Sequence, residues 1–196
     1  LDVDAYIVLN EVQICGIGIE IQNNQSKLFD NQISKSHEYG IQLVGDDNKT
    51  RCMPLVWRNR IEQCAFDGII VYGQHCEPDI RGNIIANNAQ DGIEISHYLA
   101  TQYNQIVGNW IGVNANGQAA GNGENGITFE DQVNNNYVYQ NVIASNAYNG
   151  VRFYTVYDNY LFDNWIGLLP NGTARPNGSA QSQKGSSGVF LMGGSS

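Results

Sequence analysis

Two glutamates and an arginine alternate with apolar residues in three short segments, each of which begins with a glycine. The segments read "GIEI", "GITFE" and "GVRF", and they carry Glu94, Glu130 and Arg152. A pair of carboxylates can act as general acid and base on a glycosidic bond, and an arginine can pair with the carboxylate of an acidic sugar. These three are therefore the candidate catalytic residues, although the sequence contains no complete catalytic constellation.

Four further residues extend this group as candidates for substrate binding. Tyr72 and Tyr154 end two glycine-initiated segments, and their rings could stack on sugars. His97 and Asp131 follow just beyond two other segments. Together with Asp131, the two glutamates could also supply oxygen ligands to calcium. No cofactor is predicted beyond this possible calcium ion.

More ordinary interpretations compete with this chemistry. Glu130 and Arg152 could form only an exposed cross-strand ion pair, which would contribute well under about 1 kcal/mol. Asp67 and Asp91 each directly precede a strand glycine, where asparagine stands in other segments, and this indicates turn residues. The sequence also lacks zinc-type Cys and His spacing, a phosphate loop and a nucleophile elbow.

A repeated frame along the chain must position these residues. An asparagine with an aliphatic residue two places after it and another three places before it occurs at Asn10, Asn31, Asn59, Asn83, Asn109, Asn141 and Asn164. A glycine-initiated apolar segment follows most of these anchors, at Gly40, Gly68, Gly92, Gly126, Gly150 and Gly188. The frame predicts short strands of period two, stacked about 4.8 Å apart. Asparagine tolerates left-handed backbone and can stack in hydrogen-bonded ladders, so we expect both at the anchors.

The segment "NVIASNAYNGVRF" resembles the coil of the right-handed parallel β-helix in the pectin-lyase-like superfamily. The resemblance covers essentially the whole chain and implies an all-β fold, a single-stranded right-handed parallel β-helix (a solenoid) of about seven coils. We expect one domain over residues 1–196, cut from a longer chain, with loop excursions at 112–125 and 167–187. Because the superfamily includes lyases, hydrolases, epimerases and adhesins, the resemblance leaves the function open.

Stacked coils also predict which side chains share the outward face of the glycine-initiated strands. One column contains Gln42, Ile70, Glu94, Thr128, Arg152 and Phe190, and the next contains Val44, Tyr72, Ser96, Glu130, Tyr154 and Met192. In the related enzymes the substrate groove follows this face, so the resemblance implies a saccharide site here. Trp110 and Trp165 directly follow anchors in two copies of "NWIG" and should pack against the loops, with sugar stacking as the alternative.

The cysteines and sequons predict an oxidising location. Cys52 and Cys76 each lie seven residues before an anchor, so they share a column on adjacent coils, within the Cα range of a disulfide. We predict a Cys52–Cys76 disulfide and free thiols at Cys15 and Cys64. Candidate N-glycosylation sites are Asn24, Asn48, Asn171 and Asn177. Together these features favour a secreted, extracellular or cell-surface protein.

The composition of the chain argues against two classes of partner, nucleic acids and the membrane interior. The net charge of −9 argues against a nucleic-acid surface, and no apolar run approaches the roughly 18–20 residues of a membrane span. The favoured function is an extracellular structural, surface or adhesin-type solenoid that contacts glycans and joins further β-helix coils or stacks end to end. The alternative is a polysaccharide-active enzyme, either a lyase, an epimerase or a hydrolase, that acts on acidic glycans.

Overall fold

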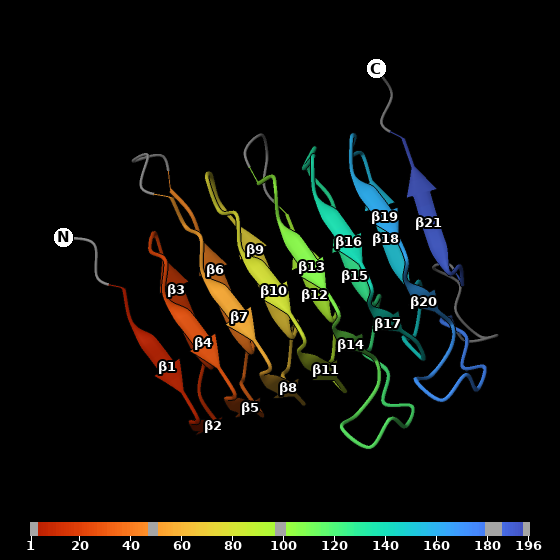
Figure 1. Ribbon diagram of the computed structural model, residues 1–196, viewed down its shortest axis with the longest axis horizontal. Coiled ribbons are helices and arrows are strands. Elements are labelled where there is room, and N and C mark those ends of the chain that lie inside the picture. Colours follow the sequence, from red (N-terminus) through yellow and green to blue (C-terminus); the bar gives the residue numbers. More distant parts are fainter. Residues whose placement is uncertain (1–3, 47–50, 97–100, 179–185, 194–196) are drawn as a thin grey trace.

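The chain winds through three parallel sheets, here called A, B and C. The computed structural model describes residues 4–46, 51–96, 101–178 and 186–193. Within these residues each sheet contains seven strands, and each inner strand pairs with the strands one coil before and after it. Figure 1 shows the strands of successive coils side by side. The predicted all-β parallel β-helix is therefore confirmed. About six turns join the seven strands of each sheet, where about seven coils were expected.

The strands are short, with two to four residues each. Sheet A contains β1 (Tyr6–Val8), β4 (Lys27–Phe29), β7 (Leu55–Trp57), β10 (Asp79–Arg81), β13 (Gln105–Val107), β16 (Tyr137–Tyr139) and β19 (Tyr160–Phe162). Sheet B contains β2 (Glu11–Gln13), β5 (Gln32–Ser34), β8 (Arg60–Glu62), β11 (Ile84–Ala86), β14 (Trp110–Ile111), β17 (Val142–Ile143) and β20 (Trp165–Ile166). Sheet C contains β3 (Ile19–Gln22), β6 (Ile41–Val44), β9 (Ile69–Tyr72), β12 (Ile93–Ile95), β15 (Ile127–Phe129), β18 (Val151–Tyr154) and β21 (Val189–Met192). Among the described residues, no helix is long and apolar enough to cross a membrane.

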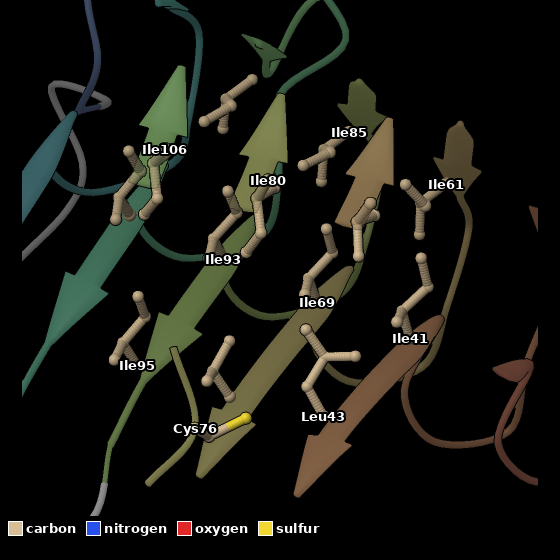
Figure 2. Packing of buried hydrophobic residues seen from close by; sticks show 14 of the residues in the cluster. Ile41, Leu43, Ile61, Ile69, Cys76, Ile80, Ile85, Ile93, Ile95 and Ile106 are labelled. Carbon is tan, nitrogen blue, oxygen red and sulfur yellow. The ribbon is translucent and has the colours of Figure 1, made fainter. Parts of the chain in front are cut away.

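Stacked aliphatic side chains fill the space between the three sheets. Ile80 of sheet A, Ile85 of sheet B and Ile93 of sheet C are fully buried in one cluster (Figure 2). Each has a counterpart in register on the next coil; Ile80, for example, pairs with Ile106. Because strand side chains alternate between two faces, every inward isoleucine puts its neighbours on the outer surface. The core therefore fixes which side chains of sheet C point outward; among these, Gln42, Ile70 and Thr128 are themselves buried.

The anchor asparagines form a buried ladder along the solenoid. Asn83 donates hydrogen bonds from its backbone nitrogen and from Nδ2 to Oδ1 of Asn109, both at 2.9 Å. Asn109 does the same to Asn141, at 2.9 and 3.0 Å. The side-chain amide of each rung also donates to a backbone carbonyl of the coil before it, as Asn109 does to Ile80 at 2.9 Å. The predicted ladder is confirmed, and it satisfies polar groups that would otherwise be buried without partners.

Left-handed backbone occurs one place before the anchors. Asp30, Arg58 and Gln140 have φ values of 54°, 55° and 57°, and Gly82 and Gly108 take the same conformation before their anchors. The expectation that the anchor asparagines themselves are left-handed is wrong. An anchor must aim its backbone N–H and its side-chain amide together at the next coil, so the reversal of direction falls on the preceding residue.

The two long loops leave the solenoid at the same corner, after β14 and β20 (Figure 1). Each contains an isolated antiparallel bridge, Val113 with Ala119 and Leu168 with Ala174. Trp110 packs partly buried against the small cluster of Val113, Ala144 and Leu169, which agrees with the predicted loop packing. Trp165 is 49% exposed and lines a groove with Gln140, Asn141, Val142, Asp163 and Pro170.

Cys52 and Cys76 are neighbours on adjacent coils, as predicted. They form an isolated parallel bridge, both are fully buried, and their sulfur atoms lie 2.6 Å apart. The structure holds both as thiols, so the disulfide is not confirmed and stays a prediction. Cys15 and Cys64 are free, and burial raises the pKa of the Cys64 thiol.

The candidate glycosylation sites differ in accessibility. Asn171 is exposed at the second loop, and Asn24 is partly exposed. Asn177 is only 5% exposed, and its Nδ2, the atom that carries a glycan, donates to the Ile143 carbonyl at 2.9 Å, so a glycan there would disturb this buried contact. Asn48 lies outside the described residues.

Candidate functional site

The outward face of sheet C carries the predicted columns. Strand pairing aligns Glu20, Gln42, Ile70, Glu94, Thr128, Arg152 and Phe190 in one column along β3, β6, β9, β12, β15, β18 and β21. The second column is aligned at Val44 with Tyr72 and at Tyr154 with Met192. Ser96 and Glu130 follow directly after β12 and β15 and continue the backbone ladder. The repeat frame thus predicted the register of this face correctly.

Arg152 is engaged by its neighbours on the face. Its guanidinium lies 2.9 Å from the Glu130 carboxylate and stacks over the Tyr154 ring at 4.7 Å. Both charged side chains are between a quarter and a third exposed. The competing interpretation of Glu130 and Arg152, as a cross-strand ion pair, therefore describes the geometry. Glu130 still lies near enough to Glu94 for its charge to raise the pKa of Glu94.

Glu94 lies beside two other carboxylates. Asp67, Asp91 and Glu94 each have a carboxylate oxygen within 4.8 Å of those of the other two. Asp67 and Asp91 are 1% and 4% exposed and directly precede the first glycines of the sheet C strands. A Cβ atom at Gly92 would lie 2.6 Å from the carbonyl oxygen of Gly126, so glycine is required there by close approach of the next coil. This tight corner brings the aspartates under the face.

Burial raises the pKa of all three carboxyl groups. The pKa of Asp67 rises to about 8, first through burial and then through the charges of Glu94 and Asp91. Burial raises the pKa of Glu94 to about 7, against a hydrogen bond from Ser96 that lowers it, and Asp91 and Glu130 raise it further. Burial likewise raises the pKa of Asp91 to about 6. A carboxyl group that titrates near neutral pH on an exposed face is suited to general acid–base chemistry.

The predicted calcium ligands are not gathered into one group. Glu130 pairs with Arg152, and Asp131 is exposed, with a φ of 58°. In the part of the chain that the structure describes, Asp67, Asp91 and Glu94 form the one acidic group of three. We do not assign it as a metal site, because Oδ1 of Asp67 and of Asp91 already accept ladder hydrogen bonds. Calcium binding stays a prediction.

The other residues predicted to bind substrate lie on different coils of the solenoid. Tyr72 lies on β9, and its hydroxyl accepts a 2.6 Å hydrogen bond from Nε2 of Gln42 on the previous coil. Tyr154 lies with Arg152 on β18. His97 is outside the described residues. The structure thus brings Arg152 and Tyr154 together on one strand. Glu94 and Tyr72 lie on preceding coils, and Asp131 is close to neither pair of residues.

A groove of about 360 Å³ adjoins Arg152. It is lined by Glu124, Asn125, Tyr148, Asn149, Arg152, Tyr154, Phe190 and Met192. Carboxylate, amide, phenol and guanidinium groups converge here beside apolar surface, which is typical of small-molecule and sugar sites. The groove follows the same outward face, one to three coils beyond Glu94.

Glu124 and Tyr148 line this groove but stand outside the predicted columns. Each lies two places before a strand glycine, and the backbone nitrogen of Tyr148 donates to the Glu124 carbonyl at 2.9 Å. They therefore form a third column, and their equal spacing from the strand glycine could have been recognised in the sequence. The signal was missed because the columns were drawn only from the glycine onward.

Comparison with known proteins supports the fold. The family model for the right-handed β-helix region matches residues 10–196, so the chain belongs to this family. Two solved structures of the periplasmic alginate epimerase AlgG, both variants, share 16% sequence identity with the chain. In each, the alignment covers 96% of this chain and 46% of the epimerase, with a TM-score of 0.56. The chain thus spans less than half the length of these enzymes. The comparison with curated proteins gives no match.

Proposed function

We propose that this chain is a β-helical solenoid of the cell envelope or cell exterior that binds a polysaccharide along the outward face of sheet C. The observation that carries the proposal is the groove beside Arg152, where Tyr148 and Tyr154 offer aromatic surface and Glu124 offers an acceptor for sugar hydroxyl groups. A parallel β-helix presents this face as a straight surface over several coils, which suits an extended polymer. The fold-level likeness to a periplasmic enzyme named for alginate supports both the ligand class and the location.

An acidic sugar is the ligand that best fits the cation of the groove. Arg152 is the cation among the residues that line it, and guanidinium pairs with carboxylate through two parallel hydrogen bonds. The ligand would have to replace Glu130 as the partner of Arg152. This exchange costs little, because a partly exposed ion pair contributes under about 1 kcal/mol.

The proposed binding mode predicts that Arg152→Gln weakens binding to immobilised alginate or pectate about tenfold, the loss of one charge-assisted contact. Affinity electrophoresis or biolayer interferometry measures the change. The matched control is Arg81→Gln, because Arg81 is also an exposed strand arginine paired with a carboxylate, that of Asp79, but it faces outward from sheet A. Equal binding by the Arg152 variant and the wild type would remove Arg152 from the site.

A second function is favoured by one observation. Glu94, with a pKa raised to about 7, is poised to give or take a proton on the face where the polymer lies. In this second function the chain is an enzyme that acts on acidic glycans as a lyase, an epimerase or a hydrolase, and the outward face of sheet C is its active site.

The catalytic function predicts that Glu94→Gln lowers turnover about 100-fold or more while binding is retained. New reducing ends, unsaturated products and exchange of the C5 proton into heavy water distinguish the three reaction classes on pectate, alginate and glycosaminoglycans. Glu20→Gln is the control, since Glu20 occupies the same column on β3. If the wild type shows none of these products with or without calcium, the catalytic function is excluded and the binding function stands alone.

A further inference from the structure

A second asparagine ladder runs beneath the sheet C face and changes composition midway. Its rungs are the residues that directly precede four strand glycines: Asp67, Asp91, Asn125 and Asn149. Asn149 donates from its backbone nitrogen and from Nδ2 to Oδ1 of Asn125, at 3.1 and 2.9 Å. Asn125 donates in the same way to Oδ1 of Asp91, at 2.6 and 3.0 Å. Asn149 and Asn125 thus each use two donors toward the rung of the preceding coil.

At Asp91 the side-chain donor is missing. Its backbone nitrogen still donates to Oδ1 of Asp67 at 2.8 Å, so the rung keeps the geometry of the ladder. Oδ1 of Asp91 accepts from Asn125, so its other carboxylate oxygen takes the place that Nδ2 has in asparagine. The carboxylate oxygens of Asp67 and Asp91 that approach each other lie within 4.8 Å, and neither oxygen carries a hydrogen when both groups are ionised. Both side chains are almost fully buried, so water cannot supply the missing hydrogen at low cost.

We propose that Asp67 and Asp91 share one proton in the folded protein, and that this proton replaces the asparagine amide hydrogen of the ladder. The proton is taken up from solvent on folding and held between one oxygen of each carboxyl group. At high pH it returns to solvent and leaves two buried carboxylates facing each other. The contact between these two coils is therefore sensitive to pH.

The negative groups that face the pair oppose its ionisation, whereas hydrogen bonds to Asp91 favour it. Glu94 on β12 and Glu124, just before β15, are both negative neighbours of Asp67. Asn125 and Thr128 hydrogen-bond Asp91 and favour its ionised form, and Tyr39, before β6, faces Asp67. Arg152 contacts Glu130 and Tyr154, and its positive charge acts on Glu94. Burial is the leading cause of the raised pKa for both aspartates.

The sign of the effect follows from linkage. Asp67 has a pKa of about 8 in the folded protein against its ordinary 3.8, so the folded state holds a proton that the unfolded state has lost between these values. The stabilisation is complete below the unfolded pKa and is lost as pH rises toward the folded pKa. For each proton that only the folded state binds, the folding equilibrium constant falls about tenfold for every unit by which the pH rises in this window. Glu94 adds to the same trend, so it needs its own control.

Two variants distinguish a shared ladder proton from simple charge repulsion. Asp91→Asn and Asp67→Asn remove the same charge, but only Asp91→Asn places an Nδ2 donor toward the neighbouring rung. We expect Asp91→Asn to raise the folding constant at about pH 9 by about 100-fold over the wild type, and clearly above Asp67→Asn. Glu94→Gln should keep most of the pH dependence. Urea unfolding at about pH 5, 7 and 9 provides the comparison.

Infrared difference spectroscopy reports the proton without any unfolding. The carbonyl stretch of a neutral carboxylic acid should be present in the wild type at neutral pH, disappear as pH rises and be reduced in Asp91→Asn. Equal gains in stability for the two aspartate variants would overturn the proposal, because charge removal alone would explain them. So would a wild type whose stability does not change with pH, or one without the carboxylic acid signal.

Discussion

Replacing Asn109 by alanine should lower the free energy of unfolding by about 3–5 kcal/mol. Asn109 is fully buried in the middle of the anchor ladder. It donates to Asn141 and to the carbonyl of Ile80, and its Oδ1 accepts two hydrogen bonds from Asn83. Alanine keeps the backbone N–H that Asn141 accepts from, but it removes the Oδ1 that accepts from Asn83 and the Nδ2 that donates to the Ile80 carbonyl. Each buried group left without a partner costs about 1–3 kcal/mol. Urea denaturation followed by circular dichroism measures the loss.

The control for this variant is Asn116→Ala. Asn116 is exposed in the loop after β14, and its backbone nitrogen, not its side chain, makes the hydrogen bond to Asn114. We expect a change within about 0.5 kcal/mol there. A loss below about 1 kcal/mol for Asn109→Ala would show that the ladder contributes little to stability, and that stacked aliphatic side chains alone hold the coils together.

The second large effect is expected at the cysteine pair. If Cys52 and Cys76 oxidise to a disulfide, Cys76→Ser should cost about 3 kcal/mol, since the bond would close a loop of 24 residues in the unfolded chain. Their adjacent coil positions and complete burial place the two thiols where a disulfide can form. The measurement is the mass of the alkylated, unreduced protein, combined with the urea midpoint with and without reductant.

Cys64→Ser is the matched control for the loss of a buried thiol. Cys64 is 2% exposed and free, and its thiol donates to the Glu62 carbonyl at 3.7 Å. Its variant should respond to reductant as the wild type does. Four alkylated cysteines in unreduced protein, with a midpoint that ignores reductant, would contradict the predicted disulfide.

The repeat frame predicted the fold and the register of the outward face from local sequence. Ile93 and Ile95 had to point inward if the segment was a strand, and this alone placed Glu94 outward, as observed. The anchor asparagines predicted a ladder because buried amides need partners, and stacked copies can provide them. Periodicity of this kind is a property of the chain itself, so it can be read without the structure.

The electrostatics of the site could not be read in the same way. The sequence indicated turn residues at Asp67 and Asp91, and the structure places each directly before a strand glycine. Their approach to Glu94 depends on the tight glycine corner and on side-chain direction. The pairing of Glu130 with Arg152 was predicted as one of two alternatives. Which carboxylate keeps a raised pKa is decided by burial and neighbours, and these are set by packing across coils.

The central claim is that a polysaccharide lies on the outward face of sheet C, and hydroxyl-radical footprinting tests it most directly. Tyr148 and Tyr154 line the proposed groove, whereas Tyr137 and Tyr160 stack at 4.9 Å on sheet A and serve as internal controls. With alginate or pectate bound, oxidation of Tyr148 and Tyr154 should slow while Tyr137 and Tyr160 are oxidised as before. Protection of the sheet A tyrosines alone, or of none of the four by either polymer, would contradict the account.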